Sequence, residues 1–418
     1  MRNAYIFPVF AIFLGSQISA TAQQPRLDPT NFVVLGEGLA AGMADFSLKD
    51  VFQEKSFPNQ MATSMDVAFP QPLFEGSGVG NVPGFPALPV RYPGPGQGSV
   101  RKDFPPQLFI FNLSVPGFHL ADAIGARPSR PVIQTQDMQK TLVNLILGYP
   151  AIILPNKPLW TQLEYAQAMN PTLALIELGY FDVLDAATNN DLNRLPNVAT
   201  FNTNYSAIVK ALRYSGGTEV LVTTVPNPLD TGYFTTVAAA NLLVPTDTAT
   251  LASRYGLRSD DLITIPGLIA MANQMRWNEA PQLPPNSVIS AATAAAIRSN
   301  VVALNGVITA VAKENGAVVF DLNATLRRIR TSGLLAGSYA LTADYLGGFY
   351  SLDGYYPGWT GSAQIANEML ALLNQTYGTS FPFIGLADIV IQDPAVRHSI
   401  AFAGTPVAPQ AKPGRILQ

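Results

Sequence analysis

Few residues in this sequence can carry hydrolytic or metal chemistry. Its 418 residues include two histidines, His119 and His398, and no cysteine. Histidine is the most frequent general base and a common metal ligand. Without cysteine there can be no disulfide, thiolate metal site or cysteine nucleophile. The histidines and carboxylates nowhere show the spacing of a metal site. We therefore expect neither a metal nor a cofactor.

The remaining polar candidates follow apolar runs that are typical of buried strands. In an open parallel sheet, ligands bind beyond the carboxyl ends of the strands, so the residues after each run form a predicted site. These segments are GEGLAAG (36–42), SVPGFHLAD (114–122), GYFDVLD (179–185), PNPLD (226–230) and, late in the chain, FYSLDGYYPGWTG (349–361).

The apolar runs alternate with helical patterns, which favours a parallel α/β sheet covered by helices on both faces. The predicted strands are 32–35, 108–113, 173–178, 219–225 and 317–321. The clearest helical patterns cover 201–213, 289–314 and 361–376.

Taken in this order, the strand-end segments resemble the catalytic blocks of the SGNH, or GDSL, family of lipases and esterases. That family carries a Ser nucleophile in a G-D-S-L block, an oxyanion Gly, an oxyanion Asn in G-x-N-D, and the Asp and His of D-x-x-H-P. The resemblance covers about residues 30–376. It implies one domain (23–384) with a three-layer α/β/α, flavodoxin-like fold, a central five-stranded parallel sheet, and insertions at about 53–106 and 226–288.

Position by position, the resemblance places Gly38 at the nucleophile, Phe181 at the oxyanion Asn and Tyr356 at the His base. A glycine cannot form a covalent acyl intermediate. A tyrosine, with a pKa near ~10, is a poor base at neutral pH. Phenylalanine donates no hydrogen bond, and losing one oxyanion donor costs ~10²–10³ in rate. The other family positions hold Glu37, Gly117, Gly179, Asp182 and Asp353.

The resemblance therefore implies a catalytically inactive relative of these esterases, which binds an acyl ester, a lipid, a glycan or a protein partner. Tyr355, Trp359 and His119 are the predicted substrate-binding residues. The aromatic side chains could instead fill the old pocket as extra core, and Asp182 and Asp353 could simply cap helices or hold loops.

Three other interpretations stay open from the sequence. An active ester hydrolase could use a relocated nucleophile or base, such as Ser114 or His119. Glu37 and Asp353 could act as paired carboxylates. GEGLAA also matches the G-x-G-x-x-A turn of dinucleotide-binding proteins, although no acidic residue follows the next predicted strand.

The N-terminus has the pattern of a signal peptide over residues 1–22. Arg2 precedes an apolar stretch (5–14), and Ala20-Thr21-Ala22 is an A-x-A cleavage site. We expect export to the bacterial periplasm or beyond, with no transmembrane span after cleavage. A net charge of -3 without a basic stripe gives no reason to expect nucleic-acid binding.

The C-terminal segment and the second insertion raise further expectations. The Pro-rich segment 385–418, which contains His398, is predicted to be a flexible tail. The insertion 226–288 could be a lid over the end of the sheet or a purely structural addition.

Overall fold

A computed structural model describes residues 27–75, 101–102, 109–134, 136–149, 151–152, 154, 156, 158–214 and 217–403. The predicted signal peptide, much of the 53–106 insertion and residues 404–418 lie outside the described residues.

The core of the protein is a parallel sheet with the strand order β1-β2-β3-β7. Its strands are β1 (Phe32–Gly36), β2 (Leu173–Glu177), β3 (Glu219–Thr223) and β7 (Val318–Phe320). All three pairings are parallel. Every residue of β1 and β2 is buried, as expected for strands covered on both faces. The predicted α/β class with a parallel sheet is confirmed.

The prediction of a full fifth strand at 108–113 is wrong for the described residues. Here the chain pairs with β1 through one parallel bridge, Val34 to Asn112. The Val34 N–H donates to the Phe111 carbonyl (2.9 Å), but the Phe111 N–H donates to Pro70 instead of extending a ladder (2.7 Å).

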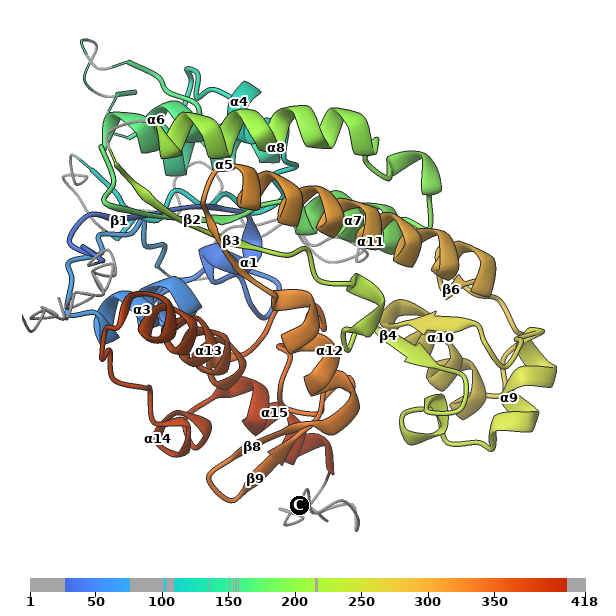
Figure 1. Ribbon diagram of the computed structural model, residues 1–418. Helices are drawn as coiled ribbons and strands as arrows, with labels where there is room; N and C mark the ends of the chain where they lie inside the picture. The colour runs from blue at the N-terminus through green and yellow to red at the C-terminus, as the bar shows by residue number, and fades with distance from the viewer. Residues whose placement is uncertain are drawn as a thin grey trace, which may run out of the picture.

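Helices lie on both sides of the sheet (Figure 1). On one side are α6 (Gln162–Ala168), α8 (Val198–Arg213) and α11 (Ala291–Glu314), and on the other are α3 (Phe57–Ser64) and α13 (Trp359–Tyr377). The pairs α8–α11 and α3–α13 pack closely. Helix α8 illustrates the sequence logic, because its buried residues recur at helical spacing and so face the core. They are Phe201, Tyr205, Ile208, Val209 and Leu212.

Helix α11 is the one helix among the described residues that is long and apolar enough to cross a bilayer. It packs on α8, β3 and β7. A single helix of this kind is weak evidence of a membrane span, because the core helix of a soluble protein passes the same test.

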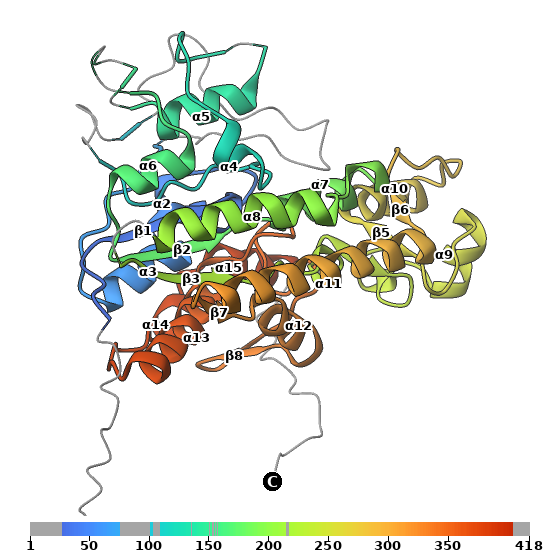
Figure 2. The ribbon, with the colours of Figure 1, turned by 45° about the horizontal axis from the view of Figure 1, so that its top comes forward.

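The predicted insertion at 226–288 forms a subdomain beyond one end of the sheet (Figure 2). It contains β4 (Phe234–Thr236) and β5 (Leu262–Thr264), with α9 (Thr248–Tyr255) and α10 (Ile265–Arg276). The antiparallel sheet is completed by β6 (Val288–Ile289). The subdomain has its own small core, made of Val237, Ala240, Val244, Leu251, Ile263, Leu268 and Met271.

The prediction of a flexible tail from 385 is wrong over residues 386–403. This stretch forms α14 (Leu386–Val390) and α15 (Pro394–Ala403). Between them the buried carboxylate of Asp393 accepts hydrogen bonds from the N–H groups of Thr360 (2.7 Å) and Ala395 (2.9 Å). Asp393 thereby satisfies the N-terminus of α13 and fixes the segment to the domain.

The remaining elements are shorter and connect these layers. They are α1 (Gly38–Ala41), α2 (Asp50–Gln53), α4 (Asp122–Gly125), α5 (Met138–Leu147), α7 (Tyr180–Thr188), α12 (Leu322–Ser332), β8 (Leu334–Ala336) and β9 (Tyr339–Leu341).

Candidate functional site

The turn after β1 leads directly into the short helix α1, which begins at Gly38. Glu37 is the N-cap residue of this helix, and its Oε1 accepts a hydrogen bond from the Leu39 N–H (2.8 Å). The Glu37 side chain is fully buried. Glu37, the one ionisable residue of the GEGL turn, therefore caps the N-terminus of α1.

Tyr356 occupies the space that a side chain at Gly38 would need. A Cβ atom added to Gly38 would lie 2.3 Å from the Tyr356 hydroxyl oxygen and 2.6 Å from its Cζ. The same hydroxyl donates a hydrogen bond to Glu37 Oε2 (2.8 Å). A serine at 38 and a tyrosine at 356 therefore exclude each other in this backbone. The residue types at positions 38 and 356 are therefore coupled by this contact.

Glu177, at the end of β2, is a site residue that the sequence analysis missed. It pairs with Gly36 in the sheet register, and its Oε2 accepts hydrogen bonds from the N–H groups of Glu37 and Ala40, both at 3.3 Å. Burial raises the pKa of Glu177, and the Glu37 charge raises it further. Burial also raises the pKa of Glu37 to about 7, opposed by its hydrogen bonds from Leu39 and Tyr356. Two buried acids thus meet beneath the turn.

Four tyrosines pack together around this turn. Tyr356 contacts Tyr355 and Tyr180 edge-on, at ring-centroid distances of 4.9 and 6.3 Å, and Tyr233 lies 5.6 Å from Tyr355. All four rings are buried. Asp353 holds their loop, because its Oδ1 accepts the N–H groups of Tyr355 (3.1 Å) and Tyr356 (2.9 Å). Burial raises the pKa of Asp353 to about 7. In this chain Asp353 positions a loop and has no histidine to orient.

A cavity of about 570 Å³ opens beside this tyrosine cluster. The domain core and the insertion both line it, and Tyr356 forms part of its wall. Of the predicted site residues, the structure brings Gly117, His119, Phe181 and Tyr356 to this cavity. Its lining is Met43, Pro116, Gly117, His119, Asp122, Gln139, Leu142, Phe181, Asp185, Thr188, Asn189, Arg194, Tyr233, Pro266, Pro284, Pro285, Asn286 and Tyr356.

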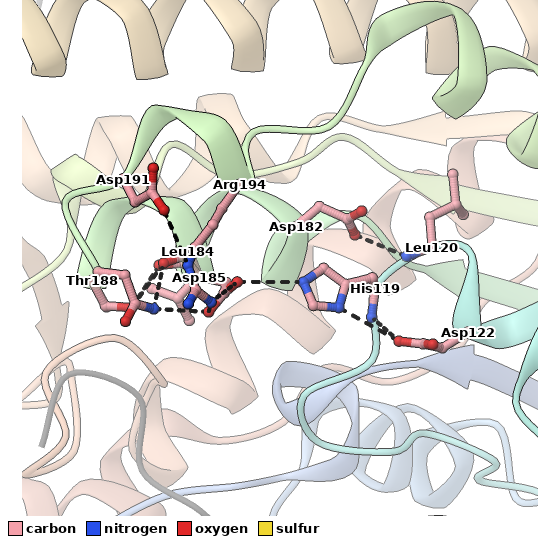
Figure 3. A network of polar contacts seen from close by, with 10 residues as sticks. His119, Leu120, Asp122, Asp182, Leu184, Asp185, Thr188, Asp191 and Arg194 are labelled. Atoms are coloured by element: carbon pink, nitrogen blue, oxygen red, sulfur yellow. Dashed lines mark hydrogen bonds and ion pairs between the residues drawn. The ribbon is translucent and has the colours of Figure 1, made fainter. Parts of the chain in front are cut away.

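His119 belongs to a network of charged groups on the cavity wall (Figure 3). Its Nδ1 lies 3.5 Å from Asp122 Oδ2, and its Nε2 lies 3.6 Å from Asp185 Oδ2. Arg194 Nη1 binds both Asp185 oxygens, at 3.1 and 3.0 Å. The Phe181 ring packs edge-on against the imidazole at 5.0 Å.

Because of this network, His119 is not suited to act as a general base at neutral pH. Burial alone would lower the pKa of His119, but the contacts with Asp122 and Asp185 outweigh it and raise the pKa to about 10. The imidazole is therefore a cation at neutral pH, with each nitrogen facing a carboxylate. A base needs a lone pair at that pH.

The cavity wall also lacks an activated nucleophile among the described residues. No serine lines it, and the hydroxyl of Thr188 donates to the Leu184 carbonyl (2.9 Å). Ser114 is buried beneath the turn, where its Oγ would lie 2.8 Å from a Cβ on Gly36. Neither residue proposed for a relocated ester hydrolase is placed to serve it.

The other predicted site residues lie away from the cavity. Tyr355 is part of the buried tyrosine cluster, and Trp359 lies beside Lys55, whose Nζ is 5.8 Å from the indole. Asp182 accepts a hydrogen bond from the Leu120 N–H (2.9 Å), and burial raises its pKa to about 6. His398 lies near Asp45, with Nδ1 and Oδ2 3.9 Å apart.

The two retained glycines have positive φ angles. Gly117 has φ +81°, and Gly179, which precedes α7, has φ +104°. A Cβ on Gly179 would also lie 2.9 Å from Val225. These turns need glycine for backbone reasons alone.

The geometry opposes the two remaining hypotheses, a dinucleotide-binding turn and a pair of catalytic carboxylates. The buried carboxylates of Glu37 and Glu177 take the N–H groups around the start of α1, where a dinucleotide pyrophosphate would have to bind. Glu37 and Asp353 both serve as backbone acceptors. Among the described residues, no group of three or more His, Cys, Asp or Glu could hold a metal ion.

Comparison with known proteins gives slight likenesses to solved hydrolase structures. No protein-family model and no curated protein matches the sequence. The chain is similar to LAE5, an alpha/beta hydrolase enzyme from the metagenome of Lake Arreo, with 10% identity, a TM-score of 0.37, and coverage of 84% of this chain and 97% of LAE5. It is also similar to the lipase/acylhydrolase from Enterococcus faecalis, with 12% identity, a TM-score of 0.33, and coverage of 85% and 100%.

A third likeness is to a protein of Parabacteroides merdae described as a GDSL-like lipase, with 10% identity, a TM-score of 0.33, and coverage of 85% and 99%. All three TM-scores lie below 0.5, so these likenesses carry no argument about function. The function of this chain has to be inferred from its own residues and the geometry of its site.

Proposed function

We propose that this chain is an exported, non-hydrolysing relative of the SGNH esterases and lipases, with their three-layer, flavodoxin-like scaffold, that binds a ligand in the cavity beside the old nucleophile position. The observation that carries the proposal is the contact between Tyr356 and Gly38. The tyrosine hydroxyl lies where a nucleophile's Cβ would stand and donates to Glu37. The family's nucleophile and base have been replaced by one buried hydrogen bond.

The cavity supports a binding role in place of the lost chemistry. Its volume of about 570 Å³ lies within the range of small-molecule pockets, roughly 300–1,000 Å³. The insertion supplies Tyr233, Pro266 and Asn286 to the wall, so we propose that it shapes the binding site. The candidate ligand classes are acyl esters, lipids and glycans. The protein would meet them in the periplasm or outside the cell.

Ester turnover tests the proposal directly. The mature chain from Gln23 is incubated with p-nitrophenyl butyrate, and a second sample is treated with a fluorophosphonate probe for activated serines. We expect a hydrolysis rate equal to that of a heat-denatured control, and no labelling. Turnover that the fluorophosphonate abolishes would contradict the proposal and reveal an activated serine.

A restoration variant tests whether the family scaffold persists. Gly38→Ser, Phe181→Asn and Tyr356→His together return the serine, the oxyanion donor and the base to the positions that they hold in the family. We expect this variant to gain measurable p-nitrophenyl butyrate hydrolysis, because the positions of Phe181 and Tyr356 face the open cavity. The control is the same variant with Gly38→Ala, which lacks a nucleophile and should stay at background.

A further inference from the structure

We propose that the cavity binds a short, uncharged glycan and not an acyl chain or an anionic ligand. This inference rests on the proposed binding function and names its ligand class. It follows from two properties of the cavity wall: its charged groups pair with one another, and it also carries rigid apolar surfaces.

The charged groups on the polar side pair with one another within the protein. His119 and Arg194 are the cations of the lining, and Asp122 and Asp185 are its anions. They pair with one another at 3.0 to 3.6 Å. Arg194 also pairs with Asp191, with Nε and Oδ2 3.6 Å apart. Three carboxylates therefore surround two cations, so an anionic ligand would be repelled, whereas a neutral ligand leaves the pairs intact.

The same polar side still offers hydrogen-bond capacity to a ligand. The Nη2 group of Arg194 and the side-chain amide of Asn286 make no hydrogen bond with another described residue, and both side chains are exposed. The half-exposed carboxylate of Asp122 and the Asn189 amide oxygen add acceptors. Sugar hydroxyls both donate and accept, so they can satisfy such a mixed set. An acyl chain would cover these groups without hydrogen bonds, which is unfavourable.

The apolar side provides flat surfaces for the C–H faces of sugar rings. Phe181 stands at the cavity with its ring against His119. Pro284 and Pro285, which are both exposed, contribute rigid apolar surface from the insertion. Aromatic side chains pair an apolar face with specific geometry, which suits a ligand that is polar at its edges and apolar on its faces.

Calorimetric titration of the mature chain tests the ligand class. The probes are three neutral trisaccharides (maltotriose, cellotriose and chitotriose), the anionic trigalacturonate, and octanoate as a soluble acyl ligand. We expect at least one neutral trisaccharide to bind, and trigalacturonate and octanoate to bind at least ten times more weakly. Arg194→Ala should weaken trisaccharide binding about 10-fold or more, because it removes a charge-assisted hydrogen bond.

Two further variants control the interpretation. Arg258→Ala removes an exposed arginine outside the cavity lining and should leave the affinity unchanged. Phe181→Ala should weaken binding without lowering the melting temperature as much as a core substitution, because Phe181 is only partly buried.

The outcomes separate this inference from the proposed function. Binding of octanoate or trigalacturonate in preference to every trisaccharide overturns the glycan assignment and leaves a non-hydrolysing binding protein. Absence of binding by all five probes also overturns the glycan assignment. Fluorophosphonate-sensitive ester turnover overturns the proposed function itself, whichever ligand binds.

Discussion

Two neighbouring regions at the carboxyl end of the sheet have opposite character. At the turn after β1, Gly38, Glu37 and Tyr356 form a sealed unit in which all the side chains are buried and hydrogen-bonded. Next to it, the cavity is open, and its polar groups pair while partly exposed to solvent. Tyr356 belongs to both regions. The turn after β1 is therefore part of the core, while the neighbouring wall is open to solvent.

This comparison predicts that substitutions in the sealed region change stability and that substitutions in the open region change binding. The largest effect should come from Tyr356→Ala. It removes a buried ring and the donor to Glu37, and losses of buried aromatic side chains typically cost ~3–5 kcal/mol. Urea unfolding measures the change. Tyr214→Ala is the matched control, since Tyr214 is 75% exposed, and it should alter the free energy of unfolding by less than ~0.5 kcal/mol. If the two variants lowered the free energy of unfolding equally, the sealed region would contribute no more to stability than the surface.

The next largest effect should be a dependence of stability on pH that comes from Glu37. Its carboxyl ionises near pH 4.5 in the unfolded chain, but burial raises its pKa to about 7 in the fold. Its contribution to stability is therefore complete below about pH 4.5 and is lost as the pH rises to about 7. Each unit of pKa difference corresponds to ~1.4 kcal/mol. The free energy of unfolding should thus fall between pH 4.5 and 7 by more in the natural chain than in Glu37→Gln.

The pH experiment has a simple control. Glu314→Gln changes an exposed carboxyl at the end of α11 and should leave the pH profile of the natural chain unaltered. A Glu37→Gln profile that parallels the natural one would show that the buried acid does not govern this pH range.

The smallest effect on stability should come from Arg194→Ala in the open region. Its ion pair with Asp185 is partly exposed, with 48% of the Arg194 side chain accessible, and such pairs contribute ~0.2–1 kcal/mol. The melting temperature should change little while trisaccharide binding weakens. A loss of stability comparable to that of Tyr356→Ala would show that the cavity wall is structural.

The sequence predicted the α/β class with a parallel sheet because that class depends on local patterns. The apolar runs at 32–35, 173–178, 219–225 and 317–321 overlap β1, β2, β3 and β7. The run at 108–113 does not extend the sheet, because a partner distant in sequence, Pro70, takes the Phe111 N–H. Likewise, nothing local to Asp393 indicates that it caps α13 and folds α14 and α15 onto the domain.

In the site too, local features could be predicted from the sequence, whereas contacts between distant residues could not. The motifs predict changed residues at the nucleophile, base and oxyanion positions of the family that the sequence resembles. The contact that links Gly38 with Tyr356 was not, because the two residues are 318 positions apart and meet only in the fold. Glu177 was missed because it ends an apolar run and looks like a strand residue. His119 was predicted as a site residue. One of its carboxylate partners, Asp122, is three residues away, but the other, Asp185, lies on α7 and meets His119 only in the fold.

A double-mutant cycle between Gly38 and Tyr356 tests the central claim most directly. The free energy of unfolding is measured for the natural chain, Gly38→Ser, Tyr356→Ala and the double variant. Overpacking a buried site costs ~1–3 kcal/mol, so Gly38→Ser should destabilise the natural chain by about that amount. In the Tyr356→Ala background, where the space is free, the same serine should cost little. If Gly38→Ser costs the same in both backgrounds, Tyr356 does not occupy the nucleophile's place and the account is wrong.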